Sequence, residues 1–254
     1  MSINTRLCLM AITELGLLSS PAIGEDHKVE HVWDYSGSLG PNHWGDLKPE
    51  FATCSAGHLQ SPIDIRSPKK ADLPAIEFHY KPSPLHIVDN RHTIMINYSP
   101  SSFIDVGGKR YELKQFHFHR PSEEKINGHA SEMSVHLVHA DADGNLAVVA
   151  VLLNKGDDNP LIHELWNDLP KEKDKEAVLE NVQIDLSQLL PVNRGYYTFS
   201  GSLTTPPCTE KVTWFVLKQP VTISDAELER FANLYQNDAR PTQPQNGRVV
   251  LESK

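Results

Sequence analysis

The stretch "QFHFHR", residues 115–120, places two histidines on either side of one phenylalanine. Successive side chains of a β-strand point to opposite faces, so His117 and His119 would share one face, while Phe116 and Phe118 occupy the other. An apolar face behind two imidazoles is what a metal site built on a sheet needs. Two ordinary histidines on a half-buried strand would show the same pattern. The stretch therefore predicts a strand and leaves the role of its histidines open.

Strand patterns recur on both sides of this stretch. Alternating or continuous apolar segments lie at residues 76–80, 85–88, 92–98, 133–139, 146–153 and 212–217. Gly107 and Gly108 predict a hairpin turn that leads into the strand with the two histidines. The chain is therefore expected to be rich in strands joined by short turns.

Helical patterns are few. One helix is expected within residues 159–169, and Ser224 with Glu227 forms a capping box ahead of residues 228–235. Residues 25–60 show neither the two-residue period of a strand nor the 3.6-residue period of a helix, and they are expected to be irregular. Together these patterns predict a single α+β, predominantly β domain, built on a large central, mostly antiparallel twisted sheet with short peripheral helices.

The histidine pair needs a third ligand to make a catalytic metal site. The segment Ser134 to His139 offers His136 and His139, which would face opposite sides of a strand, so only one of them can join the pair. Catalytic zinc sites take three protein ligands and keep a fourth position for water. His136 is the third candidate, although spacing alone does not settle the choice.

Composition excludes some classes of partner. The chain has 254 residues, a formal net charge of −9 and 39% hydrophobic residues, which describes an ordinary soluble globular protein. Without a basic cluster, neither nucleic acid nor an anionic membrane surface is an expected partner. Thirteen histidines make metal or proton chemistry worth testing.

The N-terminus has the order of a secretory signal peptide. Arg6 precedes an apolar stretch over residues 7–18, and small residues follow up to Gly24. The apolar stretch is too short and too interrupted for a transmembrane helix. We therefore expect residues 1–24 to be a signal peptide, residues 25–254 to be the mature domain, and the protein to be periplasmic or secreted.

Cysteine usage agrees with export. Cys8 leaves with the expected signal peptide, and Cys54 and Cys208 remain. Two cysteines in an exported chain most simply form one disulfide. The alternative is two unrelated buried thiols.

Several motifs taken together resemble the α-class carbonic anhydrases. They are "QFHFHR", "HLVH" at 136–139, "GSLTTPPC" at 201–208, "QSPIDI" at 60–65 and "RPTQP" at 240–244. The resemblance spans roughly residues 30 to 250, and the cysteine pair is similar to the disulfide of the exported bacterial members. It implies the fold described above, a Zn²⁺ cofactor and the reversible hydration of CO₂ to bicarbonate and a proton.

The resemblance also implies the zinc ligands and the groups that aim the nucleophile. His117, His119 and His136 match the ligands, and Gln115 matches the residue that orients His117. Thr204 matches the threonine that accepts a hydrogen bond from the attacking zinc-bound hydroxide. Glu123 matches the carboxylate to which that threonine donates its own proton. A threonine committed to Glu123 can only accept from the hydroxide, which aims an oxygen lone pair at CO₂.

Further matches concern the substrate and the proton. The apolar or polar residues that would hold CO₂ or bicarbonate beside the zinc are Thr204, Thr205, Val138, Val148, Leu203, Val212 and Trp214. His92 matches the histidine that shuttles the proton to solvent, and Asn90 and Tyr35 match polar residues that order the connecting water. Without the resemblance, His92 would be taken for an exposed histidine and the apolar residues for ordinary core.

Three positions depart from the family pattern. Ser134 stands where the family often has a glutamate that orients the third ligand. A hydroxyl is a weaker partner than a carboxylate, so either the zinc affinity or the pKa of the bound water is expected to change. Glu124 stands where many relatives have a histidine and adds negative charge beside Glu123. Met95 makes the rim of the cavity more apolar.

Two other classes of function remain as alternatives. A catalytically silent member would serve as a binding or structural module, but such members typically lose a ligand, and all three are present here. A zinc hydrolase acting on small esters would use the same nucleophile. CO₂ or bicarbonate is the expected small-molecule partner, and a homodimer stays open.

Overall fold

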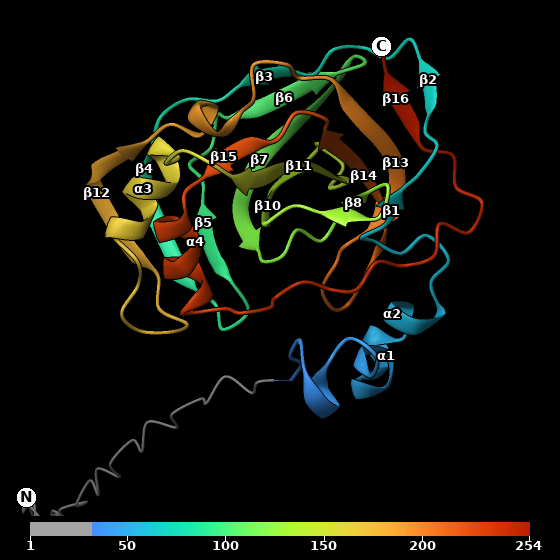
Figure 1. Ribbon diagram of the computed structural model, residues 1–254, viewed down its shortest axis with the longest axis horizontal. Helices are drawn as coiled ribbons and strands as arrows, with labels where there is room; N and C mark the ends of the chain where they lie inside the picture. The colour runs from blue at the N-terminus through green and yellow to red at the C-terminus, as the bar shows by residue number, and fades with distance from the viewer. Residues whose placement is uncertain (1–31) are drawn as a thin grey trace, which may run out of the picture. The chain divides into compact units, whose positions relative to one another are not determined.

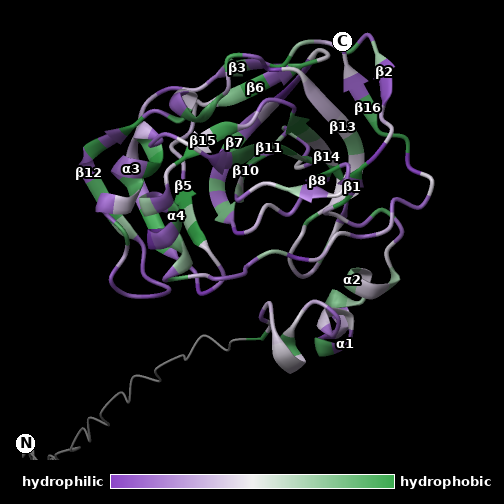
Figure 2. Ribbon diagram, viewed as in Figure 1, coloured by the Kyte–Doolittle hydropathy of each residue, from purple (hydrophilic) through white to green (hydrophobic). Residues whose placement is uncertain are grey.

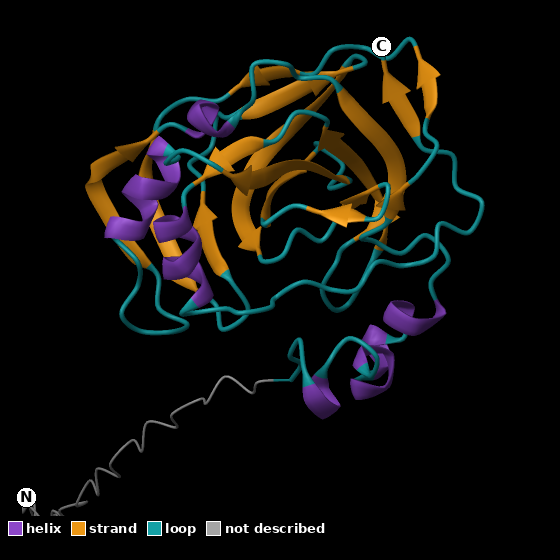
Figure 3. Cartoon of the chain, viewed as in Figure 1, coloured by secondary structure: helices purple, strands orange, loops and turns teal. Residues whose placement is uncertain are grey.

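One large sheet forms the body of the molecule, and the computed structural model describes it over residues 32–254 (Figure 1). The expected signal peptide, residues 1–24, lies outside the described residues. Within residues 32–254, no helix is long and apolar enough to cross a membrane. Strands dominate, and the few helices are short, as Figure 3 shows. The predicted fold class, predominantly β with short helices, is confirmed.

Thirteen of the described strands belong to the large sheet, and its main path runs in the order β12-β4-β5-β7-β10-β11-β14-β13-β16-β2. Most neighbouring pairs are antiparallel, while β14 and β15 pair with β11 in parallel and β2 pairs with β16 in parallel. A separate three-stranded sheet contains β1, β8 and β9. The expected mostly antiparallel arrangement is therefore confirmed, with a mixed region around β11.

The strands have the following bounds: β1 (Asp64–Ile65), β2 (Lys69–Ala71), β3 (Glu77–His79), β4 (Ser83–Asp89), β5 (Ile94–Asn97), β6 (Phe103–Val106), β7 (Lys109–His119), β8 (Lys125–Ile126), β9 (His129–Ala130), β10 (Met133–Ala140), β11 (Leu146–Lys155), β12 (Ala177–Ile184), β13 (Tyr196–Ser202), β14 (Glu210–Leu217), β15 (Val221–Ile223) and β16 (Leu251–Ser253). The turn predicted at Gly107 and Gly108 joins β6 to β7, and both glycines have a positive φ, which glycine adopts without strain.

The helices have the following bounds: α1 (Trp44–Leu47), α2 (Thr53–Ala56), α3 (Pro160–Asn167) and α4 (Asp225–Ala232), with 3₁₀-helices η1 (Gly37–Leu39), η2 (Pro49–Phe51) and η3 (Leu186–Leu189). The capping box at Ser224 is confirmed, since its hydroxyl accepts from the Glu227 N–H and the Glu227 carboxylate accepts from the Ser224 N–H. The helix begins directly after Ser224, three residues earlier than the apolar pattern had indicated.

Phe116 and Phe118 are fully buried in the main hydrophobic cluster, on the face of β7 opposite to His117. Figure 2 shows bands of hydrophobic and hydrophilic residues along outer strands such as β12. The two rings contact each other edge to face, with centroids 6.0 Å apart. The predicted division of the opening stretch into an apolar face and a histidine face is therefore present.

The N-terminal segment is less irregular than expected. Residues 37–56 form four short helices rather than an irregular arm, and Trp44 is buried at their centre. Its indole N–H donates to the backbone carbonyls of Asp34 and Leu39. A disulfide joins Cys54 to Cys208, as expected, and connects this segment to the loop after β13. Its helices are each about one turn long, too short for the apolar period that reveals longer helices.

Candidate metal centre

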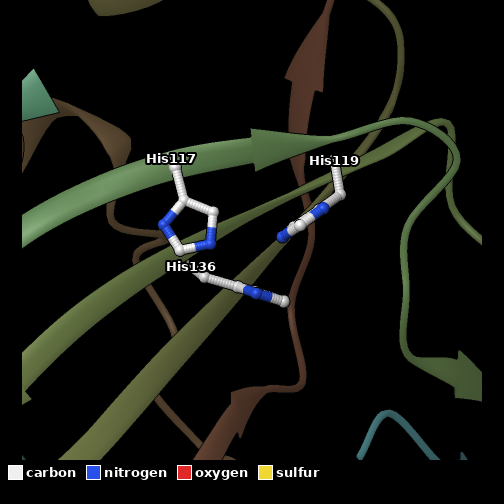
Figure 4. A group of neighbouring side chains, drawn as sticks. All are labelled: His117, His119 and His136. Carbon is white, nitrogen blue, oxygen red and sulfur yellow. The ribbon is translucent and has the colours of Figure 1, made fainter. Parts of the chain in front are cut away.

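Three histidines converge on one point of the sheet (Figure 4). His117 and His119 extend from β7, and His136 extends from β10, directly opposite His117 in the antiparallel register. One nitrogen of each ring lies within 4.8 Å of the others. His139, the other candidate for third ligand, lies outside this group because it is three positions from His136 and therefore faces the other side of the strand. The structure thus brings together the predicted set.

Hydrogen bonds decide which nitrogen of each ring is available. The Nδ1 atoms of His117 and His119 lie 2.8 Å from Gln115 Oε1 and from the backbone carbonyl of Asp238, respectively. His136 uses Nε2 instead, at 3.0 and 3.2 Å from the carboxylate oxygens of Glu124. Oxygen acceptors require each of these nitrogens to donate a proton. The remaining nitrogen of each neutral ring then carries a lone pair, as a metal ligand must.

The surroundings favour neutral rings on β7. Burial, and then the nearby His136, lowers the pKa of His117 to about 3 and that of His119 well below its ordinary value. Within the described part of the chain, His119 Nε2 is buried without a hydrogen-bond partner. A buried lone pair with no donor is what a bound cation would satisfy, so the residues present fit a metal such as Zn²⁺.

His136 differs from the other two rings. Burial lowers its pKa, but the charge and hydrogen bond of Glu124, with a smaller contribution from Glu123, outweigh burial and raise the pKa overall. One ring nitrogen of His136, Nε2, therefore faces the Glu124 carboxylate, and the other, Nδ1, faces His117 and His119. A cation among the three rings would compete with a proton for His136 Nδ1.

Glu123 and Thr204 lie beside the three rings. Burial raises the pKa of Glu123 to about 7, while the nearby His136, the Thr204 side chain and the Arg240 backbone N–H act against that rise. Glu123 Oε1 accepts from Arg240 N at 2.7 Å, and Oε2 lies 3.6 Å from His119 Nε2. Thr204 is thus close enough to Glu123 to lower the pKa of the carboxyl group, although Oε2 has no hydrogen-bond partner among the described residues. A cation at the histidines would favour the ionised carboxylate.

The residues predicted to line the substrate wall gather in one cluster. Val148, Val212 and Trp214 are buried there, and Val138 and Leu203 pack against them partly exposed. The Trp214 and His136 rings meet at nearly right angles, with centroids 4.9 Å apart. The apolar cluster therefore borders the ring of His136. Thr205 lies beyond it and its carbonyl accepts from the Cys208 N–H at 2.8 Å, which shapes the loop after Thr204.

His92 lies in the turn between β4 and β5. Its ring stacks on Trp33, with centroids 3.6 Å apart and planes within 6°. Asn90 Oδ1 accepts from the backbone N–H groups of His92 and Thr93 at 3.0 and 2.9 Å, so Asn90 also shapes the turn. The Tyr35 hydroxyl is buried, and burial raises its pKa well above the usual value.

Two hydrogen-bond partners of the histidines were not predicted from the sequence. Ser134 was expected to be the partner of His136, but the structure shows that Glu124 supplies a carboxylate to that ring instead. Ser134 Oγ instead accepts from Glu123 N at 3.3 Å. Asp238 holds His119 through its backbone carbonyl, and because every residue has one, the residue type does not reveal this role. The negative charge expected of Glu124 beside Glu123 is present and contributes to the raised Glu123 pKa.

Arg120, which had no predicted role, forms hydrogen bonds that hold the segment containing Asp238 in place. Its backbone N–H donates to Asp238 Oδ1 at 2.7 Å, its carbonyl accepts from Asp238 N at 3.0 Å, and its guanidinium donates to Gln236 O at 2.8 Å. Met95 pairs with His117 across β5 and β7 and is half-buried, where an apolar rim was expected.

Comparisons with known proteins place this arrangement in a family. The eukaryotic-type carbonic anhydrase family matches residues 39–254. A carbonic anhydrase of Neisseria gonorrhoeae is 42% identical over 96% of this chain and 97% of its own length, and one of Klebsiella pneumoniae is 43% identical over 87% and 90%. The α-carbonic anhydrase of Thermovibrio ammonificans, solved with the inhibitor sulfanilamide, is 44% identical with a TM-score of 0.83, over 86% of this chain and 98% of its own. The chain belongs to the α-carbonic anhydrase family, as its motifs had indicated.

Proposed function

We propose that the protein catalyses the reversible hydration of CO₂ to bicarbonate and a proton, with Zn²⁺ held by His117, His119 and His136. The observation that carries this proposal is the hydrogen-bond arrangement of the three rings. Each ring has one nitrogen committed to an oxygen acceptor, and the other nitrogens face one another within 4.8 Å. Membership in the carbonic anhydrase family supports the same reaction.

His117, His119 and His136 would hold the metal. Bound there by three neutral imidazoles, Zn²⁺ would keep its full double charge and would lower the pKa of a coordinated water to about 7. The protein contributes ligand orientation on β7 through Gln115 and Asp238, each of which fixes one ring. Rings held in this way need no reorganisation when the reaction begins.

Thr204 and Glu123 would orient the attack. Glu123 is held by the Arg240 N–H and lies close enough to the Thr204 side chain to interact with it. If Thr204 donates its proton to Glu123, its oxygen can only accept from a donor in the cavity. That constraint would turn the lone pair of such a donor towards the apolar wall around Val148 and Trp214. CO₂ has no net dipole, so an apolar wall is a suitable place to hold it.

His92 would carry the released proton to solvent. Histidine is the side chain that most readily both accepts and releases a proton near neutral pH. Trp33, stacked on its ring, would limit the positions that the imidazole adopts. Asn90 would support this role by fixing the turn that carries His92, and Tyr35 would lie along the polar side of the route.

We also propose that the protein is exported to the periplasm or beyond the cell. The disulfide between Cys54 and Cys208 supports an oxidising compartment, and the order of residue types over 1–24 supports a signal peptide. The proposed partner is a small molecule, CO₂ or bicarbonate. The net charge of −9 favours no nucleic acid.

Stopped-flow CO₂ hydration before and after chelation tests the proposal. We expect the chelated protein to lose its activity and added Zn²⁺ to restore it. An equally active metal-free protein would contradict the zinc mechanism, and a zinc-loaded protein without hydration activity would favour the silent binding module. Faster turnover of a small ester than of CO₂, at equal enzyme concentration, would favour the hydrolase.

A further inference from the structure

Glu124 is a buried carboxylate in the connection between β7 and β8. Its side chain is fully buried, and its two oxygens lie 3.0 and 3.2 Å from His136 Nε2. An ionised carboxylate only accepts hydrogen bonds, so His136 Nε2–H must be the donor. The contact thereby fixes the tautomer of His136 and leaves Nδ1 with the lone pair that faces the other two histidines.

No carboxylate on β10 itself serves this purpose. Ser134 lies two residues before His136 and therefore on the same face of the strand. Its hydroxyl lies 3.3 Å from Glu123 N and accepts from that N–H. A glutamate at position 134 would face the same side as His136, but the serine found there is too short to replace it. The acceptor for His136 comes instead from a different segment.

The backbone around Glu124 is fixed on both sides. The Ser122 hydroxyl donates to the Glu124 carbonyl at 2.9 Å, and the same hydroxyl accepts from Ser131 N at 2.8 Å. Lys125 N donates to Ile63 O at 3.3 Å. A carboxylate carried by an anchored segment holds its partner ring more firmly than one on a mobile loop.

The charge of Glu124 also points to the metal. Within residues 32–254, no lysine or arginine forms an ion pair with it. A buried carboxylate is costly unless a positive group compensates it. A divalent cation on His136 Nδ1 would provide this compensation through the ring, which is how a carboxylate behind a metal-bound histidine strengthens the ligand.

We propose that Glu124 is the positioning residue of His136, and that the role belongs to Glu124 because position 134 is a serine. The inference rests on the zinc site proposed above and deepens it. Adjacent glutamates then divide two tasks, since Glu123 lies beside Thr204 and Glu124 holds a ligand.

Zinc affinity, measured by competition with a chelator, tests this role without reference to activity. We expect Glu124→Gln to raise the zinc Kd about 10-fold and Glu124→Ala about 10- to 100-fold, the range for partners of metal-bound histidines. The visible spectrum of the Co²⁺-loaded protein, which reports ligand geometry, should change in both variants.

Glu227→Gln is the matched control. Glu227 is also a buried glutamate, but it accepts from Asn159 N and Ser224 N in the joint between α3 and α4. The control should lower thermal stability and leave the zinc Kd and the Co²⁺ spectrum unchanged. A purely structural role for Glu124 would give the same result as this control.

Rescue provides the second test. In the Glu124→Ala background, adding Ser134→Glu should lower the zinc Kd at least tenfold, because it returns a carboxylate to the face of His136. If the wild type binds zinc and both Glu124 variants bind it with the same Kd, the role of Glu124 is overturned but the zinc site is not. A wild-type protein that binds no zinc would overturn the zinc site and this inference together.

Discussion

His136 and His139 lie three residues apart on β10, and both are buried, yet the two faces of the strand give them different chemistry. His139 Nδ1 donates to the Leu137 carbonyl at 2.9 Å, so its Nε2 accepts from the Tyr80 hydroxyl, also at 2.9 Å. Both nitrogens of His139 are therefore satisfied by the protein. His136 has one nitrogen on Glu124 and the other turned towards two further histidines. Burial alone does not make a histidine functional; its unsatisfied nitrogen does.

The largest difference in zinc affinity is expected between a variant that replaces His136 and a variant that replaces His139. His136→Ala removes a ligand atom, so the zinc Kd should rise by more than about 100-fold, beyond the effect of losing a partner of a ligand. CO₂ hydration should fall with it. His139→Gln should lower thermal stability and keep zinc affinity and turnover. Retention of zinc by His136→Ala within tenfold of the wild type would break the comparison.

His92 extends the comparison to a histidine outside the core. His92→Ala should lower turnover in dilute buffer by about 10- to 100-fold, because general acid–base groups contribute about 10²- to 10⁴-fold and water carries part of the transfer. Added imidazole should restore the rate, and zinc affinity should stay constant. His163→Ala, at an exposed position of α3, is the control. Equal turnover of His92→Ala and the control in dilute buffer argues against the shuttle.

The last prediction concerns stability in acid rather than activity. Burial lowers the pKa of His139 to about 3, so the folded protein holds this ring neutral while the unfolded chain takes up a proton below about pH 6.5. Stability from this residue is complete above pH 6.5 and declines by about 1.4 kcal/mol per pH unit as the pH falls towards 3.

Urea unfolding of zinc-saturated protein at pH 6.5, 5.5 and 4.5 measures that slope. His139→Gln should make the decline with acid shallower, although the variant is less stable at neutral pH. His163→Gln, at an exposed histidine, should keep the wild-type slope. Parallel slopes for all three proteins would falsify the assignment of His139 as an acid-sensitive core residue.

The sequence predicts the strand-borne part of the site well. The period of two separates His117 and His119 from Phe116 and Phe118, and the structure keeps that separation. The same period separates His136 from His139, and the motifs then favour His136. These positions are predictable because strand geometry converts spacing directly into direction.

Other parts of the site carry no such signal. Asp238 acts through a backbone carbonyl, which every residue possesses, and it meets His119 across 119 positions of sequence. Glu124 acts from a connection whose path depends on contacts with Ser122, Ser131 and Ile63. Periodicity does not describe connections, so the orientation of the third ligand could not be read from the residues around it.

The contact between His119 and Asp238 has a consequence for biosynthesis. The ring is oriented by a residue 119 positions further along the chain, and Arg240 in the same segment donates its backbone N–H to Glu123. A chain that has been synthesised only as far as Asn237 would contain all three ligands and the partners of His117 and His136, but it would lack the carbonyl that orients His119. We therefore expect the metal site to reach its final form only after Asp238 and Arg240 have joined the fold, and such shorter chains to bind zinc less tightly.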